Sequence, residues 1–253
     1  MKVTILGCGT SGGVPRIGPD GGLWGACDRK NPKNRRRRVS ILVEEGETKV
    51  LVDTSPDLRE QLLDADVSRL DAVIYTHDHA DHTHGIDDLR AIAHVMGRKV
   101  DIYGNKRTLD VLFERFGYIF TEKHNYPPFC EANLIEGPLQ FGPIEVLPFE
   151  QTHGAITSYG FRFGKIAYST DLNALDEAAF EALEGVEIWI VDALRYDPHP
   201  THPHLELTLE WIARVKPKRA ILTHMTWDMD YETLRRDLPA GVEPGYDGMV
   251  IEC

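Results

Sequence analysis

The sequence predicts an α+β fold in which two β-sheets pack face to face and helices cover their outer surfaces. Short apolar runs that match β-strands recur along the whole chain. Some of these runs follow one another without an intervening helix, over residues 40–53 and 143–170, whereas segments of helical period separate the others. This mixture of hairpins and helical connections argues against a purely parallel, doubly wound sheet.

The strand-like runs are short and apolar, and most of them lead into turn residues or into a helical segment. In chain order they are VTILG (3–7), SILVEE (40–45), KVLVD (49–53), DAVIYT (71–76), VDIYG (100–104), IEVLPF (144–149), SYGFRF (158–163), KIAYST (165–170), VEIWIVD (186–192), RAILTH (219–224) and GMVIEC (248–253).

Helices are predicted where apolar residues return at steps of three and four. These segments are Pro56–Asp64, Ile86–Met96, Lys106–Phe116, Ala174–Leu183, Leu207–Val215 and Tyr231–Leu238. The 253 residues, 42% of them hydrophobic, suffice for one sizeable core, and the sequence has neither a repeat nor a low-complexity linker. We therefore expect a single domain over residues 1–253.

Composition narrows the classes of function. A formal charge of −12 argues against a large nucleic-acid surface, because each neutralised phosphate needs a cation. No apolar run reaches membrane-spanning length, and the first residues lack the pattern of a signal peptide. The four cysteines are far apart, so we expect no disulfides and a cytoplasmic protein without membrane contact.

The motif THDHADH, residues 76–82, is the strongest functional signal in the chain. It directly follows a buried-type strand, so its side chains should be held rigidly in a loop at the carboxyl end of that strand. Imidazoles and a carboxylate at this spacing suit Zn²⁺, Mn²⁺ or Fe²⁺ better than Ca²⁺. The candidate ligands are His77, His79, Asp81 and His82.

Three further polar residues repeat this pattern at the ends of other apolar runs. His153 follows IEVLPFEQT, Asp171 ends KIAYSTD and His224 ends RAILTH. One loop cannot supply two complete metal shells, and a single residue of this kind is more often an ordinary polar residue than a ligand. Together, however, the three favour a shared metal site.

With these residues the chain resembles the metallo-β-lactamase-fold hydrolases over nearly its full length, and the resemblance implies a four-layer αββα sandwich. It implies that His77, His79 and His153 hold one divalent transition metal, that Asp81, His82 and His224 hold a second, and that Asp171 bridges them. It also implies that Asp53, in VLVDTS, orients a ligand. The metal signature is specific for the superfamily but not for the substrate.

Further motifs resemble the phosphoribosyl 1,2-cyclic phosphodiesterase branch of this superfamily. They are LGCGTSGGVPRIG, NPKNRRRR, THDHADHTHGIDDLR and the segment from LTHMTWDMD to GMVIE. The resemblance implies hydrolysis of a small phosphodiester, phosphoribosyl or nucleotide-like, by a hydroxide that bridges two ions about 3.5–4 Å apart. It also implies a catalytic acid, for which we choose His204, with His202 and His199 as close alternatives, and we count Asp81 with it as catalytic.

The chain departs from this branch at a structural zinc site. The Cys-x-Cys-x-x-Cys cluster of the branch is reduced to Cys27, and its additional histidine is replaced by Trp227. One thiolate cannot build a tetrahedral site, so we expect no structural zinc and a packing role for Trp24 and Trp227. The nearby run Arg35–Arg38 is either a solvated strand entry or a phosphate-binding group.

The segment from Phe116 to Asn133 is long and rich in aromatic residues. It is either a substrate lid or a packing flap that could serve as a homodimer contact. Two rival functions stay open: a ribonuclease Z-like nuclease, for which we find no long basic insertion, and a non-catalytic, metal-dependent nucleotide-binding module. Turnover of small diesters against pre-tRNA distinguishes the three.

Overall fold

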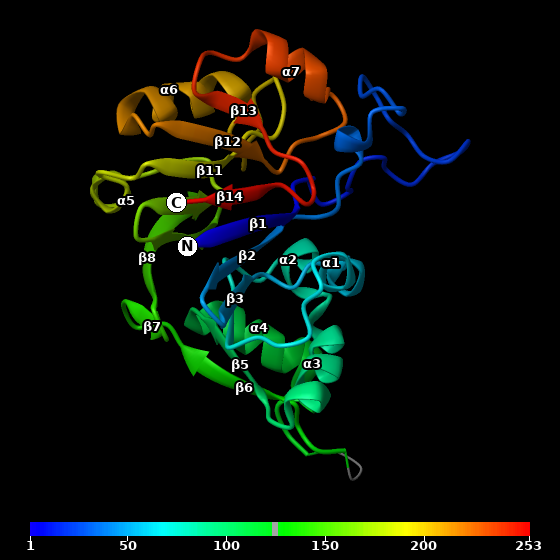
Figure 1. Ribbon diagram of the computed structural model, residues 1–253, viewed down its shortest axis with the longest axis vertical. Coiled ribbons are helices and arrows are strands. Elements are labelled where there is room, and N and C mark those ends of the chain that lie inside the picture. Colours follow the sequence, from blue (N-terminus) through cyan, green and yellow to red (C-terminus); the bar gives the residue numbers. More distant parts are fainter. Residues whose placement is uncertain (123–125) are drawn as a thin grey trace.

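The computed structural model describes residues 1–122 and 126–253 and shows two β-sheets packed face to face. Their strand orders are β14-β1-β2-β3-β4-β5-β6 and β13-β12-β11-β10-β9-β8-β7. Helices α1–α4 lie beside the first sheet and α5–α7 beside the second, while the two chain ends lie next to each other (Figure 1). The predicted four-layer αββα sandwich is confirmed.

The strands of the first sheet come from both ends of the chain. They are β1 (Lys2–Gly7), β2 (Ser40–Glu45), β3 (Thr48–Val52), β4 (Ala72–Ile74), β5 (Val100–Gly104), β6 (Cys130–Leu134) and β14 (Val250–Glu252). The second sheet contains β7 (Leu139–Phe141), β8 (Ile144–His153), β9 (Ile156–Phe163), β10 (Ile166–Ser169), β11 (Ile188–Asp192), β12 (Arg219–Thr223) and β13 (Val242–Pro244).

The predicted helices are present, with ends that shift by a few residues. The α-helices are α1 (Leu58–Asp64), α2 (Ala80–Thr83), α3 (Leu89–Met96), α4 (Lys106–Phe116), α5 (Glu177–Ala182), α6 (Leu205–Val215) and α7 (Tyr231–Asp237). Short 3-10 turns are η1 (Pro32–Asn34), η2 (Ile86–Asp88) and η3 (Gly117–Ile119). The sequence did not predict α2, because this single turn is built from the polar residues of the metal motif.

The central strands are buried on both faces, and their alternation explains why. In β2, Ile41 and Val43 belong to the core between the two sheets, whereas Leu42 between them packs toward the helices. In β3, Val50 and Val52 face the first core and Leu51 the second. Successive side chains of a strand point to opposite faces, so a nearly continuous apolar run supplies both layers.

The topology brings the ends of several strands to one edge of the sandwich. Strands β3, β4 and β5 are parallel, as are β10, β11 and β12. Strand β8 is antiparallel to β9, which is antiparallel to β10, so β8 also runs in the direction of β10. The residues that follow β4, β10, β11 and β12, together with the last residue of β8, therefore meet at this edge.

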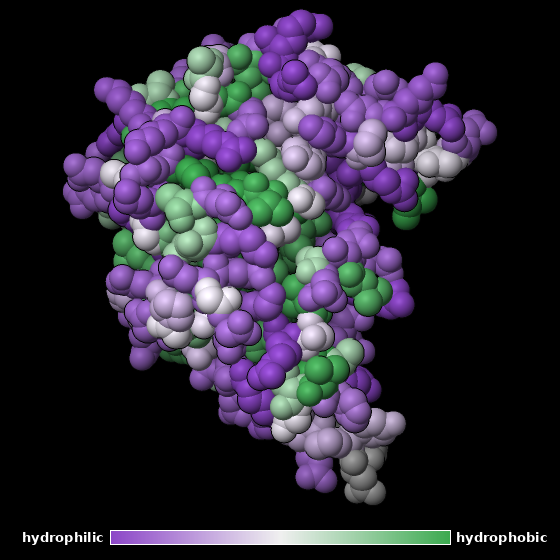
Figure 2. All heavy atoms as spheres, in the orientation of Figure 1, coloured by the Kyte–Doolittle hydropathy of each residue, from purple (hydrophilic) through white to green (hydrophobic). Residues whose placement is uncertain are grey.

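The surface is mainly hydrophilic on the face shown in Figure 2, where hydrophobic residues form small separate groups. Across residues 1–122 and 126–253, no helix has both the length and the apolarity needed to cross a membrane. All four cysteines are free thiols: Cys8, Cys27 and Cys130 are buried and Cys253 is exposed.

Candidate metal centre

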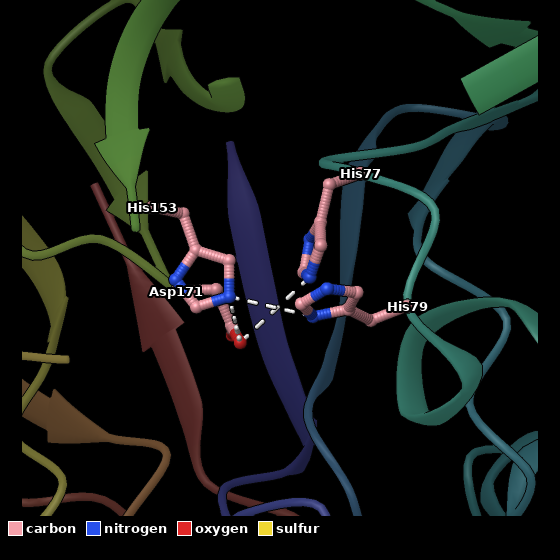
Figure 3. Close-up of side chains that lie close together, drawn as sticks. All are labelled: His77, His79, His153 and Asp171. Atoms are coloured by element: carbon pink, nitrogen blue, oxygen red, sulfur yellow. Dashed lines mark hydrogen bonds and ion pairs between the residues drawn. The ribbon is translucent and has the colours of Figure 1, made fainter. Parts of the chain in front are cut away.

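The seven predicted ligands lie together at the common edge of the two sheets. His77, His79, His153 and Asp171 form one group (Figure 3). Asp81, His82, Asp171 and His224 form a second group, and within each group the candidate ligand atoms lie within 4.8 Å of one another. These two sets of ligands share the Asp171 carboxylate, which also belongs to a third group with Asp192, His202 and His224.

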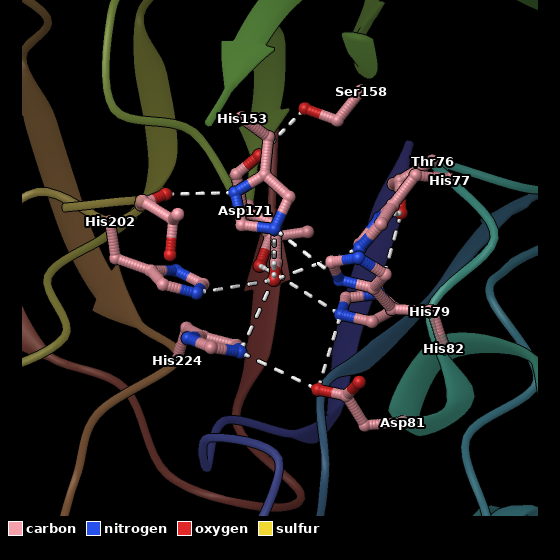
Figure 4. A network of polar contacts seen from close by, with 12 residues as sticks. Thr76, His77, His79, Asp81, His82, His153, Ser158, Asp171, His202 and His224 are labelled. Carbon is pink, nitrogen blue, oxygen red and sulfur yellow. Dashed lines mark hydrogen bonds and ion pairs between the residues drawn. The ribbon is translucent and has the colours of Figure 1, made fainter. Parts of the chain in front are cut away.

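The two oxygens of Asp171 face different halves of the cluster. Its Oδ2 lies 3.8 Å from His77 Nε2 and 3.7 Å from His153 Nε2. Its Oδ1 lies 3.1 Å from His82 Nε2 and 3.4 Å from His224 Nε2. Asp81 approaches only the second half, with Oδ2 3.5 Å from His82 Nε2 (Figure 4). This division matches the assignment of ligands that the family resemblance implies.

Hydrogen bonds at the outer ring nitrogens orient the histidines. His82 Nδ1 lies 2.7 Å from Asp53 Oδ2, which also accepts a hydrogen bond from the Thr76 hydroxyl. His153 Nδ1 donates to the backbone carbonyl of Thr201 at 2.8 Å. An acceptor on Nδ1 places the proton there and leaves Nε2 free to bind a metal. The contact predicted for Asp53 is therefore present in the structure.

The inward nitrogens fit the presence of cations. Nε2 of His77, His82 and His224 is buried and has no hydrogen-bond partner in the described part of the chain. A buried polar atom without a partner is costly, and such atoms are rare in native structures unless an ion or a water satisfies them. The imidazole and carboxylate donors suit Zn²⁺, Mn²⁺ or Fe²⁺, so the residues present fit two divalent transition-metal ions.

Three residues at the site have an uncommon backbone conformation. Asp53, Asp171 and His224 follow β3, β10 and β12, and their φ angles are 63°, 53° and 57°. Residues other than glycine seldom adopt positive φ, and such strain concentrates at functional sites. Asp53 and His224 come directly after their strands and Asp171 comes two residues after β10, so the scaffold holds these side chains at the strand ends.

The pKa values of the cluster shift in different directions, because the buried carboxylates outweigh burial at His82 and raise its pKa, raise that of His224 to about 9, and leave His77 with a lowered pKa. Burial, followed by the neighbouring charge of His82, lowers the pKa of His77 well below its usual value. Burial alone would raise the pKa of Asp171, but the histidines around it outweigh this effect and hold the pKa well below its usual range. A neutral imidazole and an ionised carboxylate are the forms that coordinate a divalent ion.

A further histidine, His202, lies in the cluster. Its ring stacks on that of His224 with centroids 4.7 Å apart, and its Nε2 lies 3.7 Å from Asp171 Oδ2. Its Nδ1 lies 2.9 Å from Oδ2 of Asp192, a fully buried residue that ends β11. His204, the residue chosen from the sequence, instead precedes the first turn of α6.

A cavity of about 400 Å³ opens over the metal ligands. It is lined by Ser11, His79, Asp81, His153, Ala155, Ile156, Asp171, Thr201, His202 and His224. His204 and His199 are not among these residues. Sequence reasoning weighed His202 only as an alternative and missed Asp192, although Asp192 ends the apolar run VEIWIVD just as Asp171 ends KIAYSTD.

The arginine run lies away from this cavity. Arg36 is buried and donates to the backbone carbonyls of Thr226 and Met229. Arg37 pairs with Asp64 and Arg38 with Asp57, whereas Arg35 is exposed. Among the residues that the structure describes, none of the four arginines lines the metal-site cavity.

The region around Cys27 and Trp227, where the sequence predicts no structural zinc, is held together by other contacts. The Ala26 amide donates to the Trp227 carbonyl at 3.0 Å, and the guanidinium of Arg16 lies 4.2 Å from the centroid of the Trp227 ring. Cys27 Sγ lies 3.8 Å from Nη1 of Arg36. The packing role expected for Trp227 is therefore present, with Arg16 rather than Trp24 against its ring.

The aromatic-rich segment 116–133 includes residues 123–125, which lie outside the described residues. Tyr126 and Phe129 line a separate cavity of about 830 Å³ together with residues 97–99, which precede β5. Because the metal centre lies at the opposite ends of the parallel strands, these two aromatic residues are not at the metal-site cavity. Nothing in their placement supports a lid.

Comparisons with known proteins agree with this fold. Residues 48–225 match the model of the family described as β-lactamase superfamily domain. The crystal structure of a new diphosphatase from the PhnP family superposes with a TM-score of 0.91 at 37% identity and covers 99% of this chain and 96% of its own. The short form of human tRNase Z, at 18% identity and a TM-score of 0.71, shares the fold over 100% of this chain and 99% of its own.

Among curated proteins, the chain is 31% identical over 257 residues to an octanoyltransferase of Porphyromonas gingivalis (strain ATCC BAA-308 / W83), covering 98% of this chain and 51% of that protein. It is 30% identical over 141 residues to a ribonuclease Z of Bradyrhizobium sp. (strain ORS 278), covering 52% and 46%. The chain thus spans about half the length of these relatives. On the family match and the fold, this chain belongs to the β-lactamase superfamily and has the metallo-β-lactamase fold.

Proposed function

We propose that this protein is a metal-dependent hydrolase of small phosphodiesters with a phosphoribosyl or nucleotide-like substrate. The observation that carries the proposal is the pair of ligand groups that meet at Asp171, with His202 beside them at the same cavity. His77, His79 and His153 would hold one ion, Asp81, His82 and His224 the other, and Asp171 both. When bound, two divalent ions supply Lewis acidity that activates water and neutralises charge on a phosphoryl oxygen.

The protein residues around the ligands hold this arrangement rigid. Asp53 keeps the proton of His82 on Nδ1, and the Thr201 carbonyl does the same for His153. Such contacts fix both the tautomer and the direction of each ring, so the unprotonated Nε2 atoms converge without rearrangement. Catalysis by positioned charges depends on this preorganisation.

We assign the general-acid role to His202 in place of His204. The Asp192 carboxylate can only accept a hydrogen bond, so the hydrogen that joins it to His202 resides on Nδ1. The second nitrogen, Nε2, then faces the cavity and can hold a proton for the leaving oxygen. His204 lines no part of this cavity in the described structure and would have to move to reach a substrate.

The size of the cavity and one structural neighbour support a small phosphorus ester as substrate. A volume of about 400 Å³ lies within the range of small-molecule sites. The similar crystal structure is described as a diphosphatase, so a relative at 37% identity acts on a phosphorus–oxygen bond. The formal charge of −12 also disfavours a long nucleic-acid partner.

The test compares His202→Ala with His204→Ala after loading with Mn²⁺ or Zn²⁺. Both variants should retain the metal content of the parent, and only His202→Ala should lose turnover of a diester with an alkyl or ribose leaving group, by about 10²–10⁴-fold. Turnover of bis(p-nitrophenyl) phosphate should fall less, because p-nitrophenolate needs little protonation. Loss in His204→Ala alone would return the role to His204.

The alternative is a ribonuclease Z-like nuclease, favoured by the 30% identity to the Bradyrhizobium ribonuclease Z over 141 residues. Cleavage of a pre-tRNA faster than a small cyclic phosphodiester would support it. Bound metal without turnover of either substrate would instead support a non-catalytic nucleotide-binding module.

A further inference from the structure

We propose that Arg16 forms a second anion site at the rim of the metal-site cavity and that it binds a phosphate group other than the one being cleaved. The inference rests on the proposed function and refines it, because it assigns the substrate to molecules with two neighbouring phosphate groups, such as diphosphate esters.

Arg16 belongs to the segment between β1 and β2, which projects from the body of the two sheets (Figure 1). The start of this segment is fixed beside the metal centre. The Thr10 amide donates to the Met225 carbonyl at 3.3 Å, and the Met225 amide donates to the Cys8 carbonyl at 2.9 Å. Residues 8–10 are thereby tied to the residue that follows the ligand His224, and Ser11 lines the cavity.

The side chain of Arg16 packs directly against this loop. A Cβ atom added at Gly12 would lie only 3.1 Å from Arg16 Cγ and Nε, so the arginine stem covers the residue next to Ser11. The Arg16 guanidinium lies 4.2 Å from the centroid of the Trp227 ring, three residues beyond His224. Both contacts place the cation beside the two segments that carry Ser11 and His224 to the cavity.

Arg16 is not used by the fold in the way that the other arginines near it are. Its Nε is buried and has no hydrogen-bond partner in the described part of the chain. Arg37 and Arg38, by contrast, pair with Asp64 and Asp57. A guanidinium stacked on an aromatic ring is held in a fixed orientation, and its two terminal nitrogens suit two-point binding of an oxyanion.

The position of this cation defines the ligand class. The metal ligands would serve the phosphate that is cleaved, so a cation at the rim can bind a second anionic group of the same molecule. The protein has a formal charge of −12, so a single arginine near the metal centre is a local source of positive potential. A ligand with two anionic groups can contact both the metal centre and this arginine, whereas a ligand with one anionic group cannot.

Binding of unreactive phosphonates tests the site without turnover. Isothermal titration of the metal-loaded protein at fixed ionic strength compares methylphosphonate, methylenediphosphonate and phosphonoacetate, with metal content measured before and after. Methylenediphosphonate should bind the parent at least about tenfold more tightly than methylphosphonate, as expected for one added charge-assisted contact.

Arg16→Met keeps the aliphatic packing on Trp227 and Gly12. In this variant the affinities for methylenediphosphonate and methylphosphonate should differ by no more than about twofold. Arg35→Met is the matched control, because Arg35 is exposed and lies at another cavity, and it should keep the full preference. An unchanged preference in Arg16→Met would overturn the proposal. An Arg16-dependent gain for phosphonoacetate alone would exclude phosphate as the second anion.

Kinetics then distinguish failure of this site from failure of the proposed function. Arg16→Met should lose at least about tenfold more kcat/KM on a diphosphate ester than on a simple phosphodiester. Equal losses on both substrates would overturn the second site while leaving the hydrolase intact. Absence of turnover in the parent, with the Arg16-dependent binding preserved, would overturn the proposed hydrolase alone.

Discussion

Removal of the buried guanidinium of Arg36 should destabilise the fold and loosen the segment next to the metal centre. Arg36 is only 2% exposed, and its Nη1 and Nη2 donate to the carbonyls of Thr226 at 3.0 Å and Met229 at 2.6 Å. These carbonyls lie two and five residues after the candidate ligand His224. The arginine thus ties the segment before β2 to the end of a metal-binding strand.

The expected size of the effect follows from the two carbonyls. In Arg36→Met the Met229 carbonyl loses its donor, whereas the Thr226 carbonyl keeps a 3.3 Å hydrogen bond from the Met229 amide. An unsatisfied buried carbonyl costs about 1–3 kcal/mol and the loss of one ordinary hydrogen bond about 0.5–1.5 kcal/mol, or about 1.5–4.5 kcal/mol together. Burying the guanidinium without a carboxylate is itself costly, and methionine removes that cost, so part of the loss is offset. We expect a net loss of about 1.5–3 kcal/mol, which lowers Tm by roughly 3–12 °C for a domain of this size.

Urea denaturation and thermal unfolding of the metal-free protein measure this change without a contribution from bound metal. Arg36→Lys should lie between the parent and the methionine variant, because one ammonium cannot reach both carbonyls as the guanidinium does. Arg35→Met, next in the chain but exposed, should change stability by no more than about 0.5 kcal/mol. A value for Arg36→Met within 1 kcal/mol of the parent would refute the reasoning.

Three further predictions concern the metal centre and its surroundings. Asp53→Asn weakens the contact that orients His82 and should reduce metal affinity by about 10–100-fold in a chelator competition, with an unchanged far-UV spectrum; unchanged affinity would contradict the orienting role. Asp171→Ala removes the carboxylate common to both ligand groups and should lower the metal content to roughly one ion per chain or less by emission spectroscopy, whereas retention of two would show that Asp171 does not bridge. Burial raises the pKa of Asp247 from 3.8 to about 6, so its contribution to stability is full below pH 3.8 and is lost as the pH rises through 6. From pH 4 to pH 7 the parent should therefore lose about 1–3 kcal/mol of unfolding free energy relative to Asp247→Asn. A difference between the two proteins that does not change with pH would contradict this expectation.

Local sequence patterns were sufficient to predict the layers and to identify the candidate ligands that meet at one edge of the sandwich. The apolar runs specify strands because alternation along a strand is a property of neighbouring residues, as Leu42 between Ile41 and Val43 shows. The ligands were recognisable for a similar reason. Four lie in one motif, and His153, Asp171 and His224 each come at the end of an apolar run, so the strand pattern itself indicates where they meet.

The choice between neighbouring histidines depended on the tertiary structure. His202 and His204 are two residues apart, and only the path of the chain before α6 decides which of them reaches the cavity. That path is held by contacts across the loop, from the Leu194 amide to the Pro203 carbonyl and from His202 to Asp192. Such contacts join residues whose spacing in the sequence carries no periodic signal.

The same holds for the arginines. A run of four identical residues offers no difference from which to predict that Arg36 is buried while Arg35 is exposed. The carbonyls that bind Arg36 lie 190 and 193 residues away along the chain. Arg16 lies in the motif LGCGTSGGVPRIG, but only the fold places it between Gly12 and Trp227. Local patterns determine which residues form strands and ligands, whereas charge pairing and burial depend on distant segments that only the folded chain brings together.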